Sequence, residues 1–442
     1  MRLRFAPAPT GYLHIGNCRT ALFNYLYALK HGGTFTLRID DTGEGVSPEF
    51  EKAIVEDLKW LGLSWDKVFR QSERKELYDR YFEVLKSKGL VYPCFCTKEE
   101  LEREREKAKR AGKAYRYSGK CRKLAEDERD RLIKSGAPHT WRFAVSPQKV
   151  SFHDLVKGKK SFSTKGMGDF IIKRSNGTYT YLFSSVVDDI ELGITHILRG
   201  EDHLSNTPLQ ILLFEAFEAD IPFFGHFPLI KTEEGKPLSK REKSRFSIRT
   251  LKEEGYLPEA VNTYLFNLGR KKPEEGIKSL KELAEVFEPA LYTGGNARFQ
   301  IEQLKSLNKE ALAALDEERL VKLMEEFCGI SSPNQRILLA VRENAATLSE
   351  LCLLYRRIAS GEFEAAISPS DKEILSRFLL FCEEEGFDID GFIRKEKVKK
   401  GKFYKLLRTS ITGLSYGPPL DEVIKLLGEE EVVKRIRKSL LQ

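Results

Sequence analysis

The chain has 442 residues, of which 41% are hydrophobic, and a formal net charge of +8. This length exceeds what one hydrophobic core organises, so we expect two to four domains. The stretch richest in large apolar residues, 211–230, contains Glu, Asp and Pro, which excludes a membrane span there. No basic stretch followed by an apolar run opens the chain, so we expect a protein that is not exported.

The first forty residues predict a strand, a helix and a second strand. Residues 2–8 predict the first strand, and Leu22, Leu26 and Leu29 stand at helical spacing before a Gly-Gly end at 32–33. Residues 34–40 alternate apolar and polar groups, as a strand does. A strand-helix-strand unit of this kind requires a parallel sheet, so an α/β domain with parallel strands is predicted.

The rest of the chain divides into an insertion and a helical part. Residues 76–135 are mostly helical and charged, and strand character returns at 140–146 and through 169–183. Residues 193–200 read as an apolar strand that runs into a helix from 201 onward, which would rejoin the first sheet. We therefore expect an inserted α+β domain over 76–175 and an all-α region from about 250.

The opening turn, "APAPTGYLHIGN", delivers the chain to a helix N-terminus that carries His14 and Asn17. Unpaired N–H groups and a partial positive charge make such a terminus suitable for a phosphate. His14 can donate a hydrogen bond to a phosphate whose charge grows during a displacement. The alternative is a histidine that only caps the turn.

A second phosphate-binding candidate is the polar loop "EEGKPLSKREK" at 233–243. Lys236, Lys240 and Arg241 could reach a triphosphate bound at the helix N-terminus and stabilise charge in the transition state. The alternative is a solvated basic loop.

Five stretches together resemble the bacterial-type glutamyl-tRNA synthetases, a family of class I aminoacyl-tRNA synthetases. They are "RFAPAPTGYLHIGN", "TLRIDDT", "KWLGLSWD", "TYTYLFSSVVDDIELGITHILRGEDHLSNTP" and "KPLSKR", in the order and at the spacings of that family. The first resembles its HIGH signature and the last its KMSKS loop. Residues 257–269 and 406–428 resemble later landmarks, so the resemblance covers the chain from end to end.

The resemblance implies the domains and the reaction. A Rossmann catalytic domain would comprise 1–75 and 176–235, the inserted acceptor-end domain 76–175, a lysine-loop and stem-contact domain 236–314, and a helical anticodon-binding region 315–442. The family joins L-glutamate to ATP as glutamyl-adenylate and passes it to the 3′ end of tRNA. The implied partners are glutamate, ATP with Mg²⁺, and tRNA-Glu or tRNA-Gln, for a cytoplasmic monomer that binds no membrane.

The resemblance also assigns the nucleotide site. The catalytic set would be His14, Asn17, Lys236 and Lys240, and ATP would bind His14, Gly16, Asn17, Ser239, Lys240 and Arg241. Two positions depart from the signatures: Asn17 replaces the second histidine of HIGH, and Pro237 replaces the first lysine of KMSKS. Both changes keep hydrogen-bonding capacity or charge nearby, so we expect activity to be retained.

Glutamate needs two cationic anchors and one anionic anchor. Arg4 and Arg199 are the cationic candidates, Asp40 would meet the ammonium, and Tyr181 would form a wall. The full implied set is Arg4, Ala6, Ala8, Asp40, Tyr181, Ser185 and Arg199. Departures from the family's usual residues are Ala8 for Ser, Asp40 for Glu, Ser185 for Asn, Gly43 for an acid and Tyr179 for Pro.

The cysteines divide into a local cluster and four single residues. "YPCFCTKEE" and "YRYSGKCRK" resemble a zinc site of the inserted domain in some relatives, which implies the ligands Cys94, Cys96, Tyr117 and Cys121. Three ordinary reduced cysteines are the alternative. We expect the other four, Cys18, Cys328, Cys352 and Cys382, to stand apart and reduced.

Residues 391–410 contain eight Lys and Arg residues and one Glu. Phe392, Phe403 and Tyr404 lie among these charges. This composition favours contact with RNA, with Lys399, Lys400 and Lys402 on phosphates and an aromatic ring stacked on a base. The alternative is a solvated helix face whose aromatic residues belong to the core.

Three other functions remain open at this stage. A small-molecule nucleotidyltransferase with a similar histidine turn would not need a basic helical C-terminal half. A glutamyl-queuosine-type synthetase lacks the helical part that residues 315–442 would form. A catalytically silent tRNA-binding paralogue would explain the altered glutamate pocket, whereas His14, Lys240 and Arg199 favour an enzyme. Asn344, beside Arg342, falls where relatives that exclude tRNA-Gln carry an arginine, which hints at relaxed or tRNA-Gln-directed charging.

Overall fold

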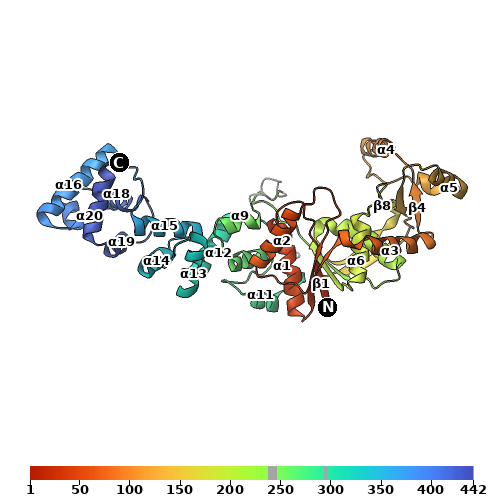
Figure 1. Ribbon diagram of the computed structural model, residues 1–442, viewed down its shortest axis with the longest axis horizontal. Helices are drawn as coiled ribbons and strands as arrows, with labels where there is room; N and C mark the ends of the chain where they lie inside the picture. The colour runs from red at the N-terminus through yellow and green to blue at the C-terminus, as the bar shows by residue number, and fades with distance from the viewer. Residues whose placement is uncertain (237–245, 293–296, 442) are drawn as a thin grey trace. The chain divides into compact units, whose positions relative to one another are not determined.

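The computed structural model describes residues 1–236, 246–292 and 297–441, and it divides into two compact units. Unit 1 comprises residues 1–249 with 265–299, and unit 2 comprises 250–264 with the residues from 300 onward. Figure 1 colours the chain by residue number. Among the described residues, no helix is long and apolar enough to cross a membrane.

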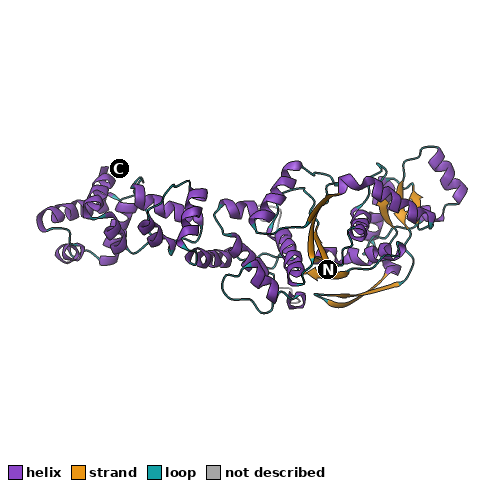
Figure 2. Ribbon diagram, turned by 60° about the horizontal axis from the view of Figure 1, so that its bottom comes forward, coloured by secondary structure: helices purple, strands orange, loops and turns teal. Residues whose placement is uncertain are grey.

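Two sheets with parallel strands form the centre of unit 1 (Figure 2). The first has the order β1-β2-β3, with β1 at Arg2–Phe5, β2 at Thr34–Ile39 and β3 at Lys67–Arg70, all parallel. The second has the order β7-β6-β10-β9, and its strands are β6 (Lys149–Asp154), β7 (Gly158–Ser163), β9 (His196–Gly200) and β10 (Phe223–Phe227). The N–H of Thr195 donates to Arg2 O at 3.0 Å, so β9 begins beside β1. The predicted strand-helix-strand unit is confirmed.

Helix α1 (Ile15–Lys30) joins the two sheets. Its Leu22, Phe23 and Leu26 are fully buried, and Asn24 Nδ2 donates to Leu198 O of β9 at 2.9 Å. On the other side, the Phe23 ring packs on Phe287 and Tyr292. The α1 N-terminus is thereby fixed relative to the ends of β1 and β9.

Five further helices belong to unit 1. They are α2 (Pro48–Trp60), α3 (Lys75–Ser87), α6 (Tyr181–Glu191), α7 (Thr207–Ala216) and α11 (Leu280–Val286), with 3-10 turns η1 (Gln71–Arg74), η3 (Thr164–Gly166), η4 (Glu201–Asn206) and η5 (Pro289–Tyr292). The predicted strand through residue 183 is wrong at its end, because α6 starts at Tyr181. The Tyr, Thr and Phe residues favour a strand, but buried Phe183, Val186 and Val187 follow helical spacing.

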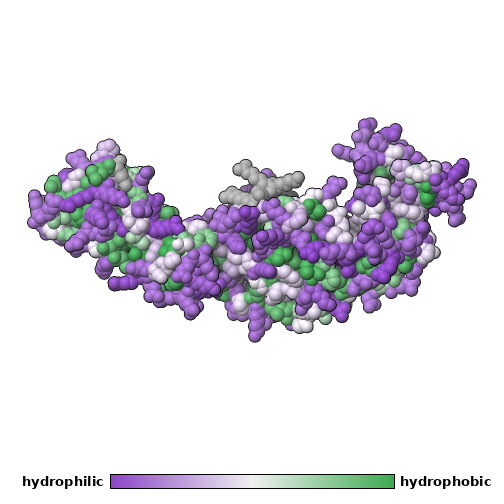
Figure 3. All heavy atoms as spheres, viewed as in Figure 1, coloured by the Kyte–Doolittle hydropathy of each residue, from purple (hydrophilic) through white to green (hydrophobic). Residues whose placement is uncertain are grey.

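The expected insertion contains a separate antiparallel sheet and a hairpin that joins the second sheet. The separate sheet has the order β4-β5-β8, with β4 at Val91–Cys94, β5 at Thr140–Phe143 and β8 at Phe170–Lys173. Beside it lie α4 (Lys98–Arg110), η2 (Lys120–Lys123) and α5 (Glu126–Lys134); α4 and α5 bury none of their residues, and Figure 3 shows a hydrophilic surface over them. The β6-β7 hairpin instead pairs with β10, Phe224 being opposite Asp154.

Unit 2 is helical, as predicted. Helices α9 (Ile248–Glu253) and α10 (Pro258–Asn267) have residues in both units. The others are α12 (Ile301–Ala313), α13 (Glu317–Cys328), α14 (Gln335–Arg342), α15 (Leu348–Ser360), α16 (Pro369–Glu385), α17 (Ile389–Glu396), α18 (Lys400–Thr412), α19 (Leu420–Leu427) and α20 (Glu429–Leu441).

One expectation for unit 2 is wrong, and one pair of alternatives is decided. Cys328 and Cys352 do not stand apart: the end of α13 meets α15, the Cα atoms are 5.8 Å apart, and a disulfide joins them. Phe392 and Phe403 do not offer stacking surfaces, because both are fully buried and pack edge-on against Phe378. The core alternative is confirmed for these two aromatic residues.

Candidate active site

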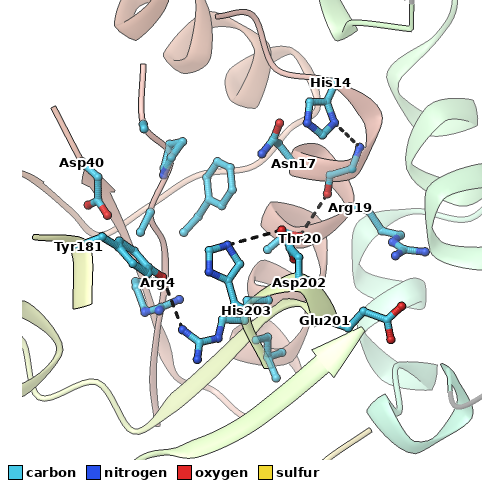
Figure 4. Close-up of a pocket in the computed structure, with 18 of the residues that line it drawn as sticks. Arg4, His14, Asn17, Arg19, Thr20, Asp40, Tyr181, Glu201, Asp202 and His203 are labelled. Carbon is cyan, nitrogen blue, oxygen red and sulfur yellow. Dashed lines mark hydrogen bonds and ion pairs between the residues drawn. The ribbon is translucent and has the colours of Figure 1, made fainter. Parts of the chain in front are cut away.

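A cavity of about 560 Å³ opens in unit 1 where β1, β2 and β9 end and α1 begins. Figure 4 shows His14 and Asn17 at the start of α1, with Arg4, Asp40 and Tyr181 on the opposite side. The carboxyl edge of parallel strands beside a helix N-terminus is where α/β enzymes bind nucleotides and their substrates. Predicted residues that line the cavity are Arg4, Ala6, Ala8, His14, Gly16, Asn17, Asp40, Tyr181 and Arg199.

His14 caps α1, and its Nδ1 accepts the N–H of Gly16 at 3.0 Å. A neutral imidazole in this arrangement carries its proton on Nε2, as a donor to a phosphate must. A Cβ at position 16 would lie 2.8 Å from His14 Cε1, so only glycine permits this close approach. The first turn of α1 contains no acidic residue, which keeps its end attractive to an anion.

The chain on either side of 237–245 is anchored at the cavity. Lys231 lines the cavity, its N–H donates to Ala297 O at 2.8 Å, and Thr232 N donates to Lys236 O at 2.8 Å. After residue 245, Ser247 forms a bridge with His14, and Ile248 N donates to Leu13 O at 2.9 Å. Lys236 is exposed; Ser239, Lys240 and Arg241 lie outside the described residues.

Arg199 is a buried cation in the cavity wall, with 5% of its surface exposed. Its acceptors are neutral: His226 Nε2 at 3.1 Å, Tyr181 OH at 3.5 Å, Thr207 Oγ1 at 2.8 Å and Gln210 Oε1 at 2.7 Å. No ion pair among the described residues joins Arg199 to a carboxylate, and burial lowers its pKa. A buried charge that no carboxylate in the described part of the chain pairs with favours an anionic substrate.

Arg4, the second cation of the cavity, is already paired with a carboxylate of the protein. Its Nε donates to Asp189 Oδ1 at 3.0 Å. The fully buried Arg38 donates to the same oxygen at 2.9 Å and to both oxygens of Asp40, at 2.7 and 3.1 Å. Burial, opposed by Arg38, raises the pKa of Asp40 to about 6. The shorter acid at position 40 therefore lines the cavity while bound to Arg38.

Ser185 lies outside the cavity lining. It is fully buried, and its Oγ accepts Gln210 Nε2 at 2.9 Å. Gln210 in turn accepts Arg199, so Ser185 orients the amide that holds the arginine.

Several residues that hold the arginines are not among the site residues predicted from the sequence. Arg38 could have been found, because an arginine two residues before Asp40 on one strand points to the same face. Asp154 and His226 carry no such signal: they are 72 residues apart and meet only through the pairing of β6 with β10.

The predicted metal ligands come together in the inserted region. Tyr117 OH lies 3.3 Å from Cys94 Sγ and 3.6 Å from Cys96 Sγ, and Cys96 Sγ lies 3.6 Å from Cys121 Sγ. Zn–S bonds of about 2.3 Å give tetrahedral edges of about 3.8 Å, so these separations fit zinc. The Arg142 guanidinium lies 3.9 Å over the Tyr117 ring, and a hydrogen bond from Cys121 lowers the pKa of Cys94 to about 4. Arg142 and Cys121 thus favour the thiolate of Cys94, whereas burial raises the pKa of Tyr117 and Cys96, and a hydrogen bond with Cys94 raises the pKa of Cys121.

In unit 2, the predicted RNA-binding lysines are exposed. Lys400 pairs with Asp390 at 2.9 Å and Lys402 with Asp371 at 3.4 Å, and both are 61% exposed. Lys399 is exposed just before α18. Exposed pairs of this kind contribute little to stability, so these lysines can exchange partners for phosphates.

The cavity combines a helix N-terminus that suits a phosphate with buried arginines that suit a carboxylate, at the end of parallel strands. This combination is typical of an α/β enzyme that acts on an anionic substrate. Two protein families match this chain. The family described as tRNA synthetases class I (E and Q), catalytic domain, matches residues 1–306, and the anticodon binding domain matches 282–440. The chain belongs to the class I tRNA synthetases of the E and Q group, which are enzymes.

Known proteins are similar in sequence to this chain over its full length. The chain is 42% identical to the glutamate–tRNA ligase of Aquifex aeolicus, covering 100% of this chain and 98% of that protein. It is 40% identical to that of Carboxydothermus hydrogenoformans, covering 99% of each. A crystal structure of a glutamate tRNA ligase from Elizabethkingia meningosepticum in complex with its amino acid superposes with a TM-score of 0.81, at 29% identity and 100% and 99% coverage.

Proposed function

We propose that this protein is a glutamate–tRNA ligase, which joins L-glutamate to ATP as glutamyl-adenylate and then to the 3′ end of tRNA. The observation that supports this proposal most strongly concerns Arg199. It is a buried cation whose described hydrogen-bond acceptors are all neutral, and it lines the same cavity as His14. The names of the full-length relatives support the same activity.

The site residues divide the work between two ends of the cavity. Arg199 and Arg4 bind the substrate carboxylates, Asp40 meets the ammonium, and Tyr181, Ala6 and Ala8 form walls. Arg199 supplies a net charge, whereas Arg4 is already paired with Asp189, so Arg199 contributes most to carboxylate affinity.

At the other end, the N-terminus of α1 with His14, Gly16 and Asn17 holds ATP, which enters with Mg²⁺ as the counterion of its phosphates. One carboxylate of glutamate attacks the α-phosphorus and pyrophosphate leaves, so alignment and charge stabilisation replace a protein nucleophile. Lys236, Ser239, Lys240 and Arg241 stabilise the departing charge, and the anchored chain ends at Lys231 and Ser247 support this role.

The inserted region holds one structural Zn²⁺ on Cys94, Cys96, Tyr117 and Cys121. The tetrahedral spacing of their ligand atoms supports this site. Four protein ligands complete the coordination of zinc and leave no position for a substrate, so the metal fixes the fold of the insertion.

The tRNA is bound in part by Lys399, Lys400 and Lys402. Asn344 follows α14 and donates to Ala340 O at 3.3 Å, while Arg342 donates to Leu315 O at 3.3 Å. Because the nearby arginine is held by the protein, we propose that charging extends to tRNA-Gln. Action in the cytoplasm follows from tRNA as substrate.

ATP–pyrophosphate exchange tests this function. With glutamate, label from pyrophosphate should enter ATP, measured with and without tRNA, and glutamine should support little exchange. Exchange with neither amino acid would favour a silent tRNA-binding paralogue. A glutamyl-queuosine-type synthetase would activate glutamate without needing an anticodon-binding part, which the match at 282–440 disfavours.

A further inference from the structure

His226, on β10, is a buried histidine that contacts the arginine of the cavity wall. It is fully buried, and its Nε2 lies 3.1 Å from Arg199 Nε and 3.0 Å from Thr207 Oγ1. Arginine can only donate, so His226 Nε2 must be an unprotonated acceptor. Burial lowers the pKa of His226 and keeps the ring neutral.

The other ring nitrogen fixes this tautomer. His226 Nδ1 lies 2.5 Å from Asp154 Oδ2, and a carboxylate only accepts, so the proton resides on Nδ1. The charged groups that act on the ring are Asp154, Arg199 and Lys157.

Asp154 is itself fixed by the backbone. Its Oδ1 accepts the N–H groups of Val156 at 3.0 Å, Lys157 at 2.8 Å and His226 at 3.2 Å. Burial raises the pKa of Asp154, but the bonds from His226 and the backbone outweigh this and lower it. The carboxylate therefore remains charged although fully buried.

We propose that Asp154 and His226 are positioning residues for Arg199 in substrate binding. Asp154 holds the proton of His226 on Nδ1, and Nε2 then accepts Arg199 Nε and fixes the plane of the guanidinium. The negative charge stays one ring away, so the arginine is oriented without being neutralised and retains its attraction for a carboxylate. Arg4, which contacts Asp189 directly, is held in the opposite way. This inference rests on the proposed function.

Asp154→Asn is the most direct test, because it preserves the shape of the side chain but changes which nitrogen of His226 carries the proton. Its amide oxygen can keep the three backbone bonds, while its NH₂ faces His226 Nδ1. The ring proton then moves to Nε2, where it opposes the Nε–H of Arg199. Loss of one hydrogen bond to a charged group should raise the KM for glutamate roughly 10- to 100-fold in pyrophosphate exchange. The KM for ATP and kcat should stay near wild type, as expected when uniform binding is weakened.

Matched variants separate positioning from folding. Asp169→Asn removes another buried carboxylate, which accepts Val145 N at 2.8 Å and Tyr92 OH at 2.6 Å, and should lower stability without changing the KM for glutamate. His226→Gln retains an acceptor for Arg199 and should keep a lower KM than His226→Phe, which fills the space without one. An unchanged glutamate KM in folded Asp154→Asn, or an equal rise for ATP, would overturn the proposal.

A spectroscopic measurement tests the protonation of His226 independently of enzyme activity. In wild-type protein labelled with ¹⁵N-histidine, the His226 signals, assigned by their loss in His226→Gln, should show a protonated Nδ1 and an unprotonated Nε2. The opposite tautomer, or an imidazolium at neutral pH, would refute the proposed positioning of Arg199 by Asp154 and His226. If wild-type protein shows no glutamate-dependent exchange, the proposed function fails, and this spectrum still decides whether Asp154 and His226 hold Arg199 as described.

Discussion

His14 combines a structural and a chemical task in one side chain. Nδ1 caps α1 by accepting Gly16 N, so a neutral ring carries its proton on Nε2, the nitrogen that we propose acts on phosphate charge. His14→Asn keeps a strong N-cap acceptor but is too short to replace the phosphate donor. We expect adenylation to slow by ~10²–10³ while the melting temperature changes little. Lys240→Ala should slow the same step by a similar factor. Near wild-type exchange in folded His14→Asn would contradict the assignment.

Asp40 gives the site a pH dependence. Because burial raises its pKa to about 6, the carboxyl is neutral below that pH and anionic above it. Only the anion attracts the substrate ammonium, so the KM for glutamate should fall as pH rises through about 6. Asp40→Asn should lose this component of the profile, measured by exchange from acid to neutral pH. Parallel profiles for the two proteins would show that Asp40 does not bind the ammonium.

At the scale of elements, we expect the insertion to depend on the proposed zinc. Protein purified without chelator should contain about one zinc per chain, as four-ligand structural sites do. Cys121→Ser should lose the metal and unfold the β4-β5-β8 region at lower temperature, followed by metal analysis and thermal denaturation. Cys382→Ser, at a half-buried cysteine outside the cluster, is the matched control. Full zinc content in the Cys121 variant would refute the ligand set.

Helix α18 and the residue before it form the predicted phosphate-binding surface. Replacing Lys399, Lys400 and Lys402 with Glu should weaken tRNA binding and flatten its salt dependence, by about one unit of slope for each phosphate that the protein no longer neutralises. The same charge change at the exposed Lys52, Lys59 and Lys67 of unit 1 is the control. Equal salt slopes for the two triple variants would place the RNA-binding surface elsewhere.

The local elements near the site could be predicted, and their tertiary partners could not. The His14 turn and the strand that carries Arg4 follow from Pro, Gly and apolar spacing over a few residues. The helix from Tyr181 was missed because its aromatic start resembles a strand. Two contacts, Asp154 with His226 and Cys328 with Cys352, form only because distant elements pack together. The spacing of residues in the sequence does not indicate which elements do so.

At the scale of the whole molecule, the two matched families imply that one chain both activates an amino acid and holds a tRNA. The cavity lies within unit 1, and the predicted anticodon-side lysines lie in unit 2. We therefore expect changes at the cavity to alter the KM for glutamate or the rate of adenylation, and changes at 399–402 to alter the KM for tRNA.

Charging of purified tRNA with radioactive glutamate is the most direct test of the central claim. We expect ATP-dependent formation of acid-precipitable glutamyl-tRNA on tRNA-Glu, with tRNA-Gln also accepting glutamate, and no product from glutamine. His14→Asn should abolish most of the product with either tRNA. If the wild-type protein binds tRNA yet forms no glutamyl-tRNA on either, the proposed ligase function is contradicted.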